Sequence, residues 1–270
     1  MQTPSDRLST SKSRAVRMDS FGGPEVLDIV AVPAPQAGPG QVRVRVTAAG
    51  LNPMDWFMTA DAGTAARFGL SLPAGFGTDY AGVVDQVGDG VTGFAPGDRV
   101  FGGALSRAVA DFVVVDPTAG IAANEAHHTP DGVDDRTAAT LTIAGRTASA
   151  ALAVVELGPD DTVLIGGAAG GVGVFAVQLA RIAGAHVIGT GSATSADFLR
   201  DLGAEPVAYG EGLADRARAL APRGITVDDR NTSSMGTICG VTGKNANPGF
   251  DCRFSSPRHV DIDLRPRRPC

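Results

Sequence analysis

The first half of the chain alternates apolar and polar residues over short runs, as half-buried strands do. Residues Gln41–Thr47 read QVRVRVT, with valine at every second position, and this period of two predicts a strand with one face in a core. Further strands are predicted over Tyr80–Val87 and Asp111–Val115. Clusters such as Gly88–Gly90 and Pro96–Asp98 separate the runs and predict turns. Many short strands with such turns indicate a small β-barrel or sandwich.

From about residue 132 the pattern changes to helices that alternate with buried strands. Asp134–Leu157 is rich in alanine and leucine and predicts two helices or one broken helix. Beyond it, strands are predicted at Thr162–Ile165, His186–Gly189 and Pro206–Tyr209, and helices at Val174–Ala183, Ala196–Leu202 and Leu213–Leu220. This βαβαβα order predicts a doubly wound parallel sheet.

The two ends of the chain follow neither pattern. Residues 1–13 are polar, and we expect them to form a disordered tail. From Asp228 onward, seven Lys and Arg residues oppose five Asp and Glu, although the whole chain has a net charge of −6. All three cysteines also lie beyond residue 238. We therefore interpret residues 229–270 as an irregular, non-native C-terminal tail, produced by a shifted reading frame or another replacement.

Composition removes several classes of function. An acidic chain with a pI of about 5.2 and no basic run in its body is a poor candidate for nucleic-acid binding. No apolar run approaches the roughly 18 residues that a membrane helix needs, and the N-terminal residues do not resemble a signal peptide. An odd number of clustered cysteines does not describe a disulfide framework. We expect a cytoplasmic protein without a nucleic-acid or membrane partner.

The strongest chemical signal is the sequence IGGAAGGVG at Ile165–Gly173, between a predicted strand and a predicted helix. Glycines in such a turn let the backbone approach a pyrophosphate closely, and the N–H groups at the start of the helix face the phosphates. The sequence therefore predicts a dinucleotide site formed by Ala169, Gly170, Gly171, Val172 and Gly173.

The residues after the second strand of this unit indicate which dinucleotide binds. An acidic residue there would hold the ribose 2′-hydroxyl of NAD. Gly189–Ser195 reads GTGSATS, with no carboxylate before Asp197. Small hydroxyl residues such as Ser192 leave room for a 2′-phosphate, although no Lys or Arg lies in this loop. NADP(H) is therefore favoured over NAD(H).

Several stretches of the chain together resemble one known superfamily. They are FGGPEVL at 21–27, AAGLNPMDW at 48–56, GTDYAGVVDQVGDGV at 77–91, FAPGDRVFG at 94–102, IAGRTASAAL at 143–152 and AAGGVGVFAVQLARIAGAHVIGTGS at 168–192. In this order they are similar to the medium-chain dehydrogenase/reductase superfamily, and specifically to its zinc-independent quinone oxidoreductase and enoyl reductase branch. The resemblance covers residues 14 to about 228.

This resemblance implies an α/β protein with two domains and an active site in the cleft between them. It implies a GroES-like β-barrel domain over residues 14–131. An incomplete Rossmann domain, with a doubly wound parallel sheet, is implied over residues 132–228. The superfamily continues with three more strands where this chain has residues 229–270. We therefore expect weak or absent turnover and poor stability.

The resemblance also implies roles for particular residues. Asn52 and Asp55 match the Asn-Pro-x-Asp segment beside the nicotinamide and substrate. Thr147 matches a threonine at the nicotinamide end of the cofactor, and Tyr209 a tyrosine near the adenosine phosphate. For each of these residues an ordinary turn, helix or core role is the alternative. Asp79 and Asp98 are expected to be structural residues of turns and the barrel.

The implied reaction is hydride transfer from NADPH to a quinone or an activated alkene, with water or Tyr80 as a proton source. Zinc is not expected, because Leu51 and Asn52 follow Ala-Ala-Gly in place of a cysteine, and His127 and His128 are expected to be solvated loop residues. A dinucleotide-binding remnant without catalysis is the alternative function. A homodimer is possible but doubtful without the strands that would pair.

Overall fold

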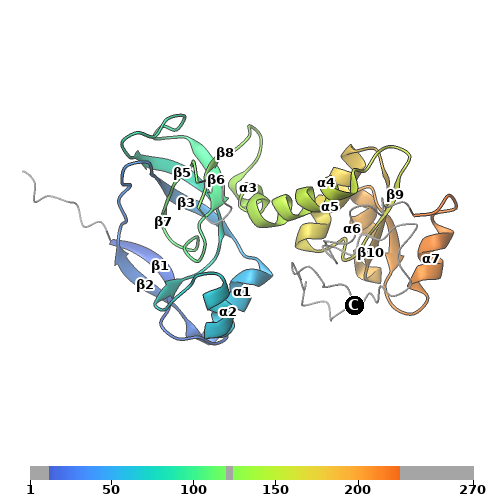
Figure 1. The fold of residues 1–270 in the computed structure, drawn as a ribbon, viewed down its shortest axis with the longest axis horizontal. Helices are drawn as coiled ribbons and strands as arrows, with labels where there is room; N and C mark the ends of the chain where they lie inside the picture. Colours follow the sequence, from blue (N-terminus) through green and yellow to red (C-terminus); the bar gives the residue numbers. More distant parts are fainter. Residues whose placement is uncertain (1–11, 120–123, 226–270) are drawn as a thin grey trace, which may run out of the picture. The chain divides into compact units, whose positions relative to one another are not determined.

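The computed structural model describes residues 12–119 and 124–225, which form two compact units divided after Ile143 (Figure 1). Each unit is described by itself. The division lies further along the chain than the boundary at 131/132 expected from the sequence. Strand β1 (Lys12–Met18) includes Lys12 and Ser13, which we had expected in the N-terminal tail. The rest of that tail and the expected C-terminal tail at 229–270 lie outside the described residues.

The described part of the first unit is built from short antiparallel strands. One sheet has the order β2-β1-β4 and the other β7-β3-β5-β6-β8, and no closed ring of strands joins them within these residues. Besides β1, the strands are β2 (Leu27–Pro33), β3 (Val42–Gly50), β4 (Ala74–Gly75), β5 (Asp79–Val87), β6 (Arg99–Gly103), β7 (Phe112–Val115) and β8 (His127–His128). Helices are η2 (Pro24–Val26), α1 (Pro53–Ala60), α2 (Ala62–Arg67) and α3 (Asp135–Ala138).

The strand predicted from QVRVRVT is confirmed as β3. Val42 and Val44 are fully buried, and they join the core of the larger sheet. Arg43 points to the other face, where its guanidinium makes an ion pair with Asp85 of β5 at 2.9 Å. The strands predicted over 80–87 and 111–115 are also confirmed, as β5 and β7. Alternation of valine with charged residues thus sets which face of β3 enters the core.

The second unit has a parallel sheet in the order β11-β10-β9 within the described residues. Its elements are α4 (Arg146–Val155), β9 (Thr162–Ile165), α5 (Gly171–Ile182), β10 (His186–Gly191), η4 (Ala193–Ser195), α6 (Ala196–Asp201), β11 (Glu205–Ala208) and α7 (Leu213–Ala219). The expected break in the helical segment over 134–157 is confirmed, because a π-helical turn, η3 (Leu141–Gly145), separates α3 from α4.

The core of the second unit explains its continuous apolar runs. Val163 and Ile165 of β9 are fully buried with Val187 of β10, in a cluster with alanines of α4 and α5. Leu164 and Ile188 point to the opposite face and pack against α7. A strand buried on both faces has no need of polar positions, which is why the Thr162–Ile165 run shows no alternation. No helix among the described residues is long and apolar enough to cross a membrane.

Candidate functional site

The predicted glycine-rich loop lies between β9 and α5, as expected. Helix α5 begins at Gly171, three residues before the predicted start at Val174, so Gly171–Gly173 form its first turn. Gly170 is the N-cap residue, with an extended conformation at φ −84° and ψ 171°. Gly167 has φ +62°, a left-handed conformation that glycine adopts without steric cost. The loop is thus compact, and its last glycines are helical.

Thr190 on β10 fixes this loop from the neighbouring strand. The N–H of Gly167 donates to Thr190 Oγ1 at 2.9 Å, and the N–H of Ala168 donates to the Thr190 carbonyl at 3.0 Å. The N–H of Gly170 closes the turn on the carbonyl of Gly167 at 2.8 Å. Thr190 is buried. No local sequence signal marks Thr190, because its partner lies 23 positions away.

We expect Thr190→Val to destabilise the second unit, because valine keeps the shape of threonine but cannot accept the hydrogen bond from Gly167. An unsatisfied, half-buried N–H should lower the free energy of unfolding by about 1–2 kcal/mol. Urea unfolding followed by circular dichroism measures this change. Thr190→Ser keeps the hydroxyl and is the matched control. Equal losses in the two variants would show that the hydroxyl does not stabilise the loop.

The first turn of α5 presents free backbone donors. The N–H groups of Gly171, Val172 and Gly173 have no hydrogen-bond partner within the described residues, and no side chain caps this helix. Apart from its chain neighbours and its own helix backbone, a Cβ added at Gly171 would meet no atom of the described residues within 4 Å. Unpaired donors and open space at the positive end of a helix dipole suit a phosphate group.

The other residues predicted for the cofactor lie after the neighbouring strands. Ser192 directly follows β10, and its Oγ makes hydrogen bonds to the hydroxyls of Thr194 at 2.8 Å and Ser195 at 2.9 Å. Tyr209 directly follows β11; its N–H donates to the carbonyl of Gly191 at 3.3 Å, and its side chain is half-exposed. Since β9, β10 and β11 are parallel, the glycine loop, Ser192 and Tyr209 share one edge of the sheet.

Thr147 is placed differently from these residues. It lies in the first turn of α4, and no hydrogen bond joins it to the glycine loop. Its neighbour Ala148 is buried in the core with residues of α5. Helix α4 therefore packs against α5, but Thr147 is not joined to the loop. The role of Thr147 toward a cofactor stays a prediction.

Asn52 and Asp55 lie together at the start of α1 in the first unit. Asn52 is the N-cap residue, and its N–H donates to Asp55 Oδ2 at 2.7 Å. Asp55 Oδ1 accepts from Thr78 Oγ1 at 2.7 Å. Asp55 is buried, and burial raises the pKa of its carboxyl although these hydrogen bonds lower it. Because both Asp55 oxygens bind protein groups, the carboxylate holds the start of α1, and its role toward a substrate stays a prediction.

Asp79, which the sequence analysis treated as a structural turn residue, is joined to Asn52. It is the first residue of β5, and its Oδ2 accepts from Asn52 Nδ2 at 3.1 Å and from the N–H of Ile143 at 3.2 Å. Asp79 is only 1% exposed. Burial raises the pKa of its carboxyl to about 7, and the charges of Asp55 and Glu125 act in the same direction. The spacing of 27 residues between Asn52 and Asp79 gave no signal for this pair.

Tyr80 is not available as a proton source in this structure, which corrects that expectation. Its side chain is fully buried in the core of the larger sheet. The hydroxyl donates to the backbone carbonyl of Glu125 at 2.8 Å. Burial raises the pKa of the phenol above its ordinary value. A buried phenol whose proton is already donated to a backbone carbonyl is a poor proton source.

The two adjacent histidines are solvent-exposed, as expected, although they form the short strand β8 and not a loop. His127 Nε2 lies 3.3 Å from Glu125 Oε2, and the His128 ring stacks on Phe94. Within residues 12–119 and 124–225, no three His, Cys, Asp or Glu side chains come together as a metal site.

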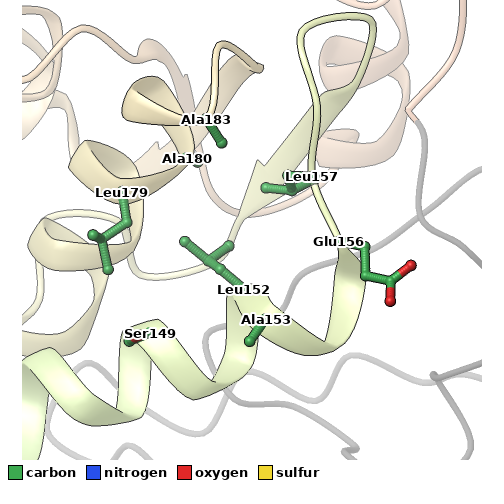
Figure 2. A pocket seen from close by; sticks show the side chains of 8 residues that line it. All are labelled: Ser149, Leu152, Ala153, Glu156, Leu157, Leu179, Ala180 and Ala183. Carbon is green, nitrogen blue, oxygen red and sulfur yellow. The ribbon is translucent and has the colours of Figure 1, made fainter.

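A shallow depression between α4 and α5 contributes nothing to the candidate site. It has a volume of about 340 Å³ and is lined mainly by small and aliphatic side chains, among them Leu152, Leu157 and Leu179 (Figure 2). The carboxylate of Glu156 points away from these side chains. Among its described lining residues, Ser149 has the only hydroxyl and none is Lys or Arg, so the depression is a poor match for a phosphate.

Comparisons with known proteins agree with this geometry. A family model described as "Alcohol dehydrogenase GroES-like domain" matches residues 38–133. The quinone oxidoreductase of Rattus norvegicus is 41% identical over 184 residues, which are 66% of this chain and 52% of the relative. This chain thus spans about half the length of the curated relatives it matches.

Two solved structures are also similar. The quinone oxidoreductase from Coxiella burnetii superposes with a TM-score of 0.69 at 34% identity, over 80% of this chain and 67% of that chain. A mycobacterial protein solved in complex with NADPH superposes with a TM-score of 0.68 at 31% identity, over 79% of this chain and 65% of that chain.

Proposed function

Because the chain belongs to the quinone oxidoreductase and enoyl reductase branch of the medium-chain dehydrogenase/reductase superfamily, we propose that it binds NADP(H) and transfers hydride to a quinone or an activated alkene without zinc. The observation that carries this proposal is the glycine loop. Its conformation is fixed by hydrogen bonds to Thr190, and it ends at the start of α5 in three N–H groups that have no partner in the described part of the chain.

The residues of the loop fit a pyrophosphate. Gly171 leaves open the space that a side chain would fill, and Gly171, Val172 and Gly173 would donate their N–H groups to the phosphate oxygens. Ser192 and Tyr209, at the same edge of the sheet, would lie beside the adenosine half. The nicotinamide, when bound, supplies the hydride, and the protein orients the two reactants and excludes water.

The preference for NADP(H) rests on the residues after β10. Ser192, Thr194 and Ser195 form a cluster of hydroxyls where a carboxylate would select NAD. These hydroxyls would donate to a 2′-phosphate without repelling it. The mycobacterial neighbour bound to NADPH supports this choice.

Independence from zinc rests on the residues that stand where zinc-dependent relatives have thiolate ligands. Leu51 and Asn52 occupy the position at which zinc-dependent relatives have a cysteine, and residues 1–238 contain no cysteine at all. In the proposed reaction, Asn52 would act in place of a Lewis acid by donating a hydrogen bond to the substrate carbonyl.

The proposal predicts that Gly171→Ala abolishes cofactor binding without unfolding the protein. The added methyl group meets no protein atom within 4 Å, and alanine has a higher helix propensity than glycine. The same methyl group would occupy the space of the pyrophosphate. We expect the Kd for NADPH to rise at least about a hundredfold. Titration of NADPH fluorescence, repeated with NADH, measures both the loss and the preference.

Gly158→Ala is the matched control for this experiment. Gly158 lies in the turn before β9 in the same unit, and a Cβ there would have only one neighbour within 4 Å, Asp161 Oδ2 at 3.8 Å. This variant should bind NADPH as the wild type does. The proposal fails if Gly171→Ala binds NADPH normally, and its NADP preference fails if NADH binds more tightly.

A second candidate, a dinucleotide-binding protein without turnover, is favoured by one observation. Within the described residues the parallel sheet has three strands, β11-β10-β9, and in a six-stranded doubly wound sheet these strands bind the adenosine side. NADPH oxidation with 1,4-benzoquinone as acceptor separates the two candidates. Tight binding with no turnover would favour the second, and turnover at ordinary enzyme rates the first.

A further inference from the structure

The two oxygens of the buried Asp79 carboxyl have different environments. Oδ2 accepts two hydrogen bonds, from Asn52 Nδ2 and from the N–H of Ile143. Oδ1 is buried and has no hydrogen-bond partner among the residues that the structure describes. Such an asymmetry is costly for an ionised carboxylate, because the negative charge extends onto an oxygen that nothing solvates.

This asymmetry determines where a proton binds. Two N–H donors point at Oδ2, so Oδ2 stays an acceptor whether or not the carboxyl is protonated. A proton therefore binds at Oδ1, the oxygen at which no donor points within the described part of the chain. In either state, the group that faces Asp79 must be the NH2 end of the Asn52 amide, since its carbonyl end would oppose another acceptor.

We propose that Asp79 is a positioning residue that holds the Asn52 side chain with its NH2 group inward, so that the second Nδ2 hydrogen is a donor of fixed direction for the carbonyl oxygen of a quinone or enone. Asn52 has an intermediate exposure, whereas Asp79 is buried behind it. This inference rests on the proposed function for its substrate, but the contact between Asp79 and Asn52 is tested separately from it.

Without Asp79 the amide would be free to turn. The NH2 and carbonyl ends of an asparagine have nearly the same shape, so packing alone does not distinguish the two orientations. A carbonyl end facing the substrate would repel the substrate oxygen where a hydrogen bond is needed. Asp79 excludes that orientation because its Oδ2 accepts and never donates.

Two other acids act on the Asp79 carboxyl, so its titration is separated from theirs by substitution. Asp55 on α1 and Glu125, in the segment before β8, are the two charged groups that act on it. Its neighbours on β3, β6 and η3 are uncharged: they are Gly50, Gly103 and Ile143. A protonation step that is sensed at Asn52 and is lost in Asp79→Asn is therefore assigned to Asp79, and a step that remains in that variant is assigned to other groups, Asp55 among them.

The first test follows the side-chain NH2 resonances of Asn52 in the full chain by ¹H–¹⁵N NMR between pH 5 and 9. The signals are assigned by their loss in Asn52→Ser. We expect them to shift with a midpoint near 7 in the wild type, and to lose this step in Asp79→Asn. Signals that do not move with pH in the wild type would overturn the inference, with no need for cofactor or turnover.

The second test compares Asp79→Asn with Asp79→Ala in NADPH-dependent reduction of 1,4-benzoquinone. Asn keeps an acceptor oxygen for Asn52 and Ile143, whereas Ala removes it. We expect kcat/KM to fall about tenfold to a hundredfold in Asp79→Ala, with an unchanged Kd for NADPH, and Asp79→Asn to restore most of it. Equal losses in the two variants, or none in Asp79→Ala, would overturn the inference.

The outcomes also separate this inference from the proposed function. If the wild type neither binds nor oxidises NADPH, the proposed function fails, and the NMR titration still decides whether Asp79 orients Asn52. If turnover is present and the Asn52 signals ignore Asp79, only the inference fails. Should Asp79→Ala not fold, the NMR comparison of the wild type with Asp79→Asn decides the inference.

Discussion

Replacement of Gly173 by alanine is expected to disrupt the second unit and to eliminate NADPH binding together. A Cβ at this position would lie 2.3 Å from the carbonyl oxygen of Gly167 and 2.7 Å from Ala168 Cα. Both are backbone atoms that no rotamer change can move, so either the loop or α5 must shift. We expect the free energy of unfolding to fall by about 3 kcal/mol. Urea unfolding and NADPH fluorescence titration measure the two effects.

Gly171→Ala is the matched control for this prediction. Two residues away in the same helical turn, it adds the same methyl group to open space. The stability of Gly171→Ala should therefore match that of the wild type, while both variants lose NADPH. Equal stability of Gly173→Ala and Gly171→Ala would contradict the close packing of Gly173 against the backbone of the loop.

The second large effect is a fall in stability as the pH rises through the titration of Asp79. An aspartate carboxyl ordinarily has a pKa of 3.8, and burial raises that of Asp79 to about 7 in the folded protein. Between these values the folded state binds more protons than the unfolded state, so the free energy of unfolding decreases with rising pH. A difference of this size is equivalent to about 4 kcal/mol in total, with a plateau above pH 7.

Asp79→Asn should not show this slope. It keeps the acceptor for Asn52 and Ile143 but has no proton to lose, so its stability should depend less on pH between 4 and 7. The raised pKa of Asp55 acts in the same direction but is common to both proteins, so the difference between them isolates Asp79. Urea unfolding at half-unit intervals of pH gives both curves. Parallel curves would contradict an unusual titration at Asp79.

The elements of the fold were predictable because their signals are local. The alternating valines of β3 predict a strand with one buried face, and the continuous apolar run of β9 predicts a strand buried on both faces. The structure confirms both predictions. The start of α5 was predicted too late, because glycine has a low helix propensity. The N–H groups of the first helical turn have no partner within the helix, so glycines cost less there. Gly171–Gly173 can therefore form this turn, where they allow close packing on the loop and leave their N–H groups open to a ligand.

The candidate site was predictable only where its residues are adjacent in sequence. The glycine loop was identified from its own residues. Thr190 and Asp79 were not, because each acts on a partner more than 20 positions away. For Asp55 and Tyr80, the residue type suggests a role in the reaction, but the structure shows that their polar atoms already bind protein groups. The Asp55 carboxylate accepts hydrogen bonds from Thr78 and Asn52, and the Tyr80 hydroxyl donates to the Glu125 carbonyl.

The hydrogen bonds from the loop to Thr190 also bear on the thermodynamics of association. A glycine-rich segment has many accessible conformations, and restricting them at the moment of contact would subtract from affinity. Here β10 restricts the backbone of Gly167 and Ala168 as the sheet forms. The entropy is thus lost once, during folding, and the dinucleotide meets a surface that needs little rearrangement.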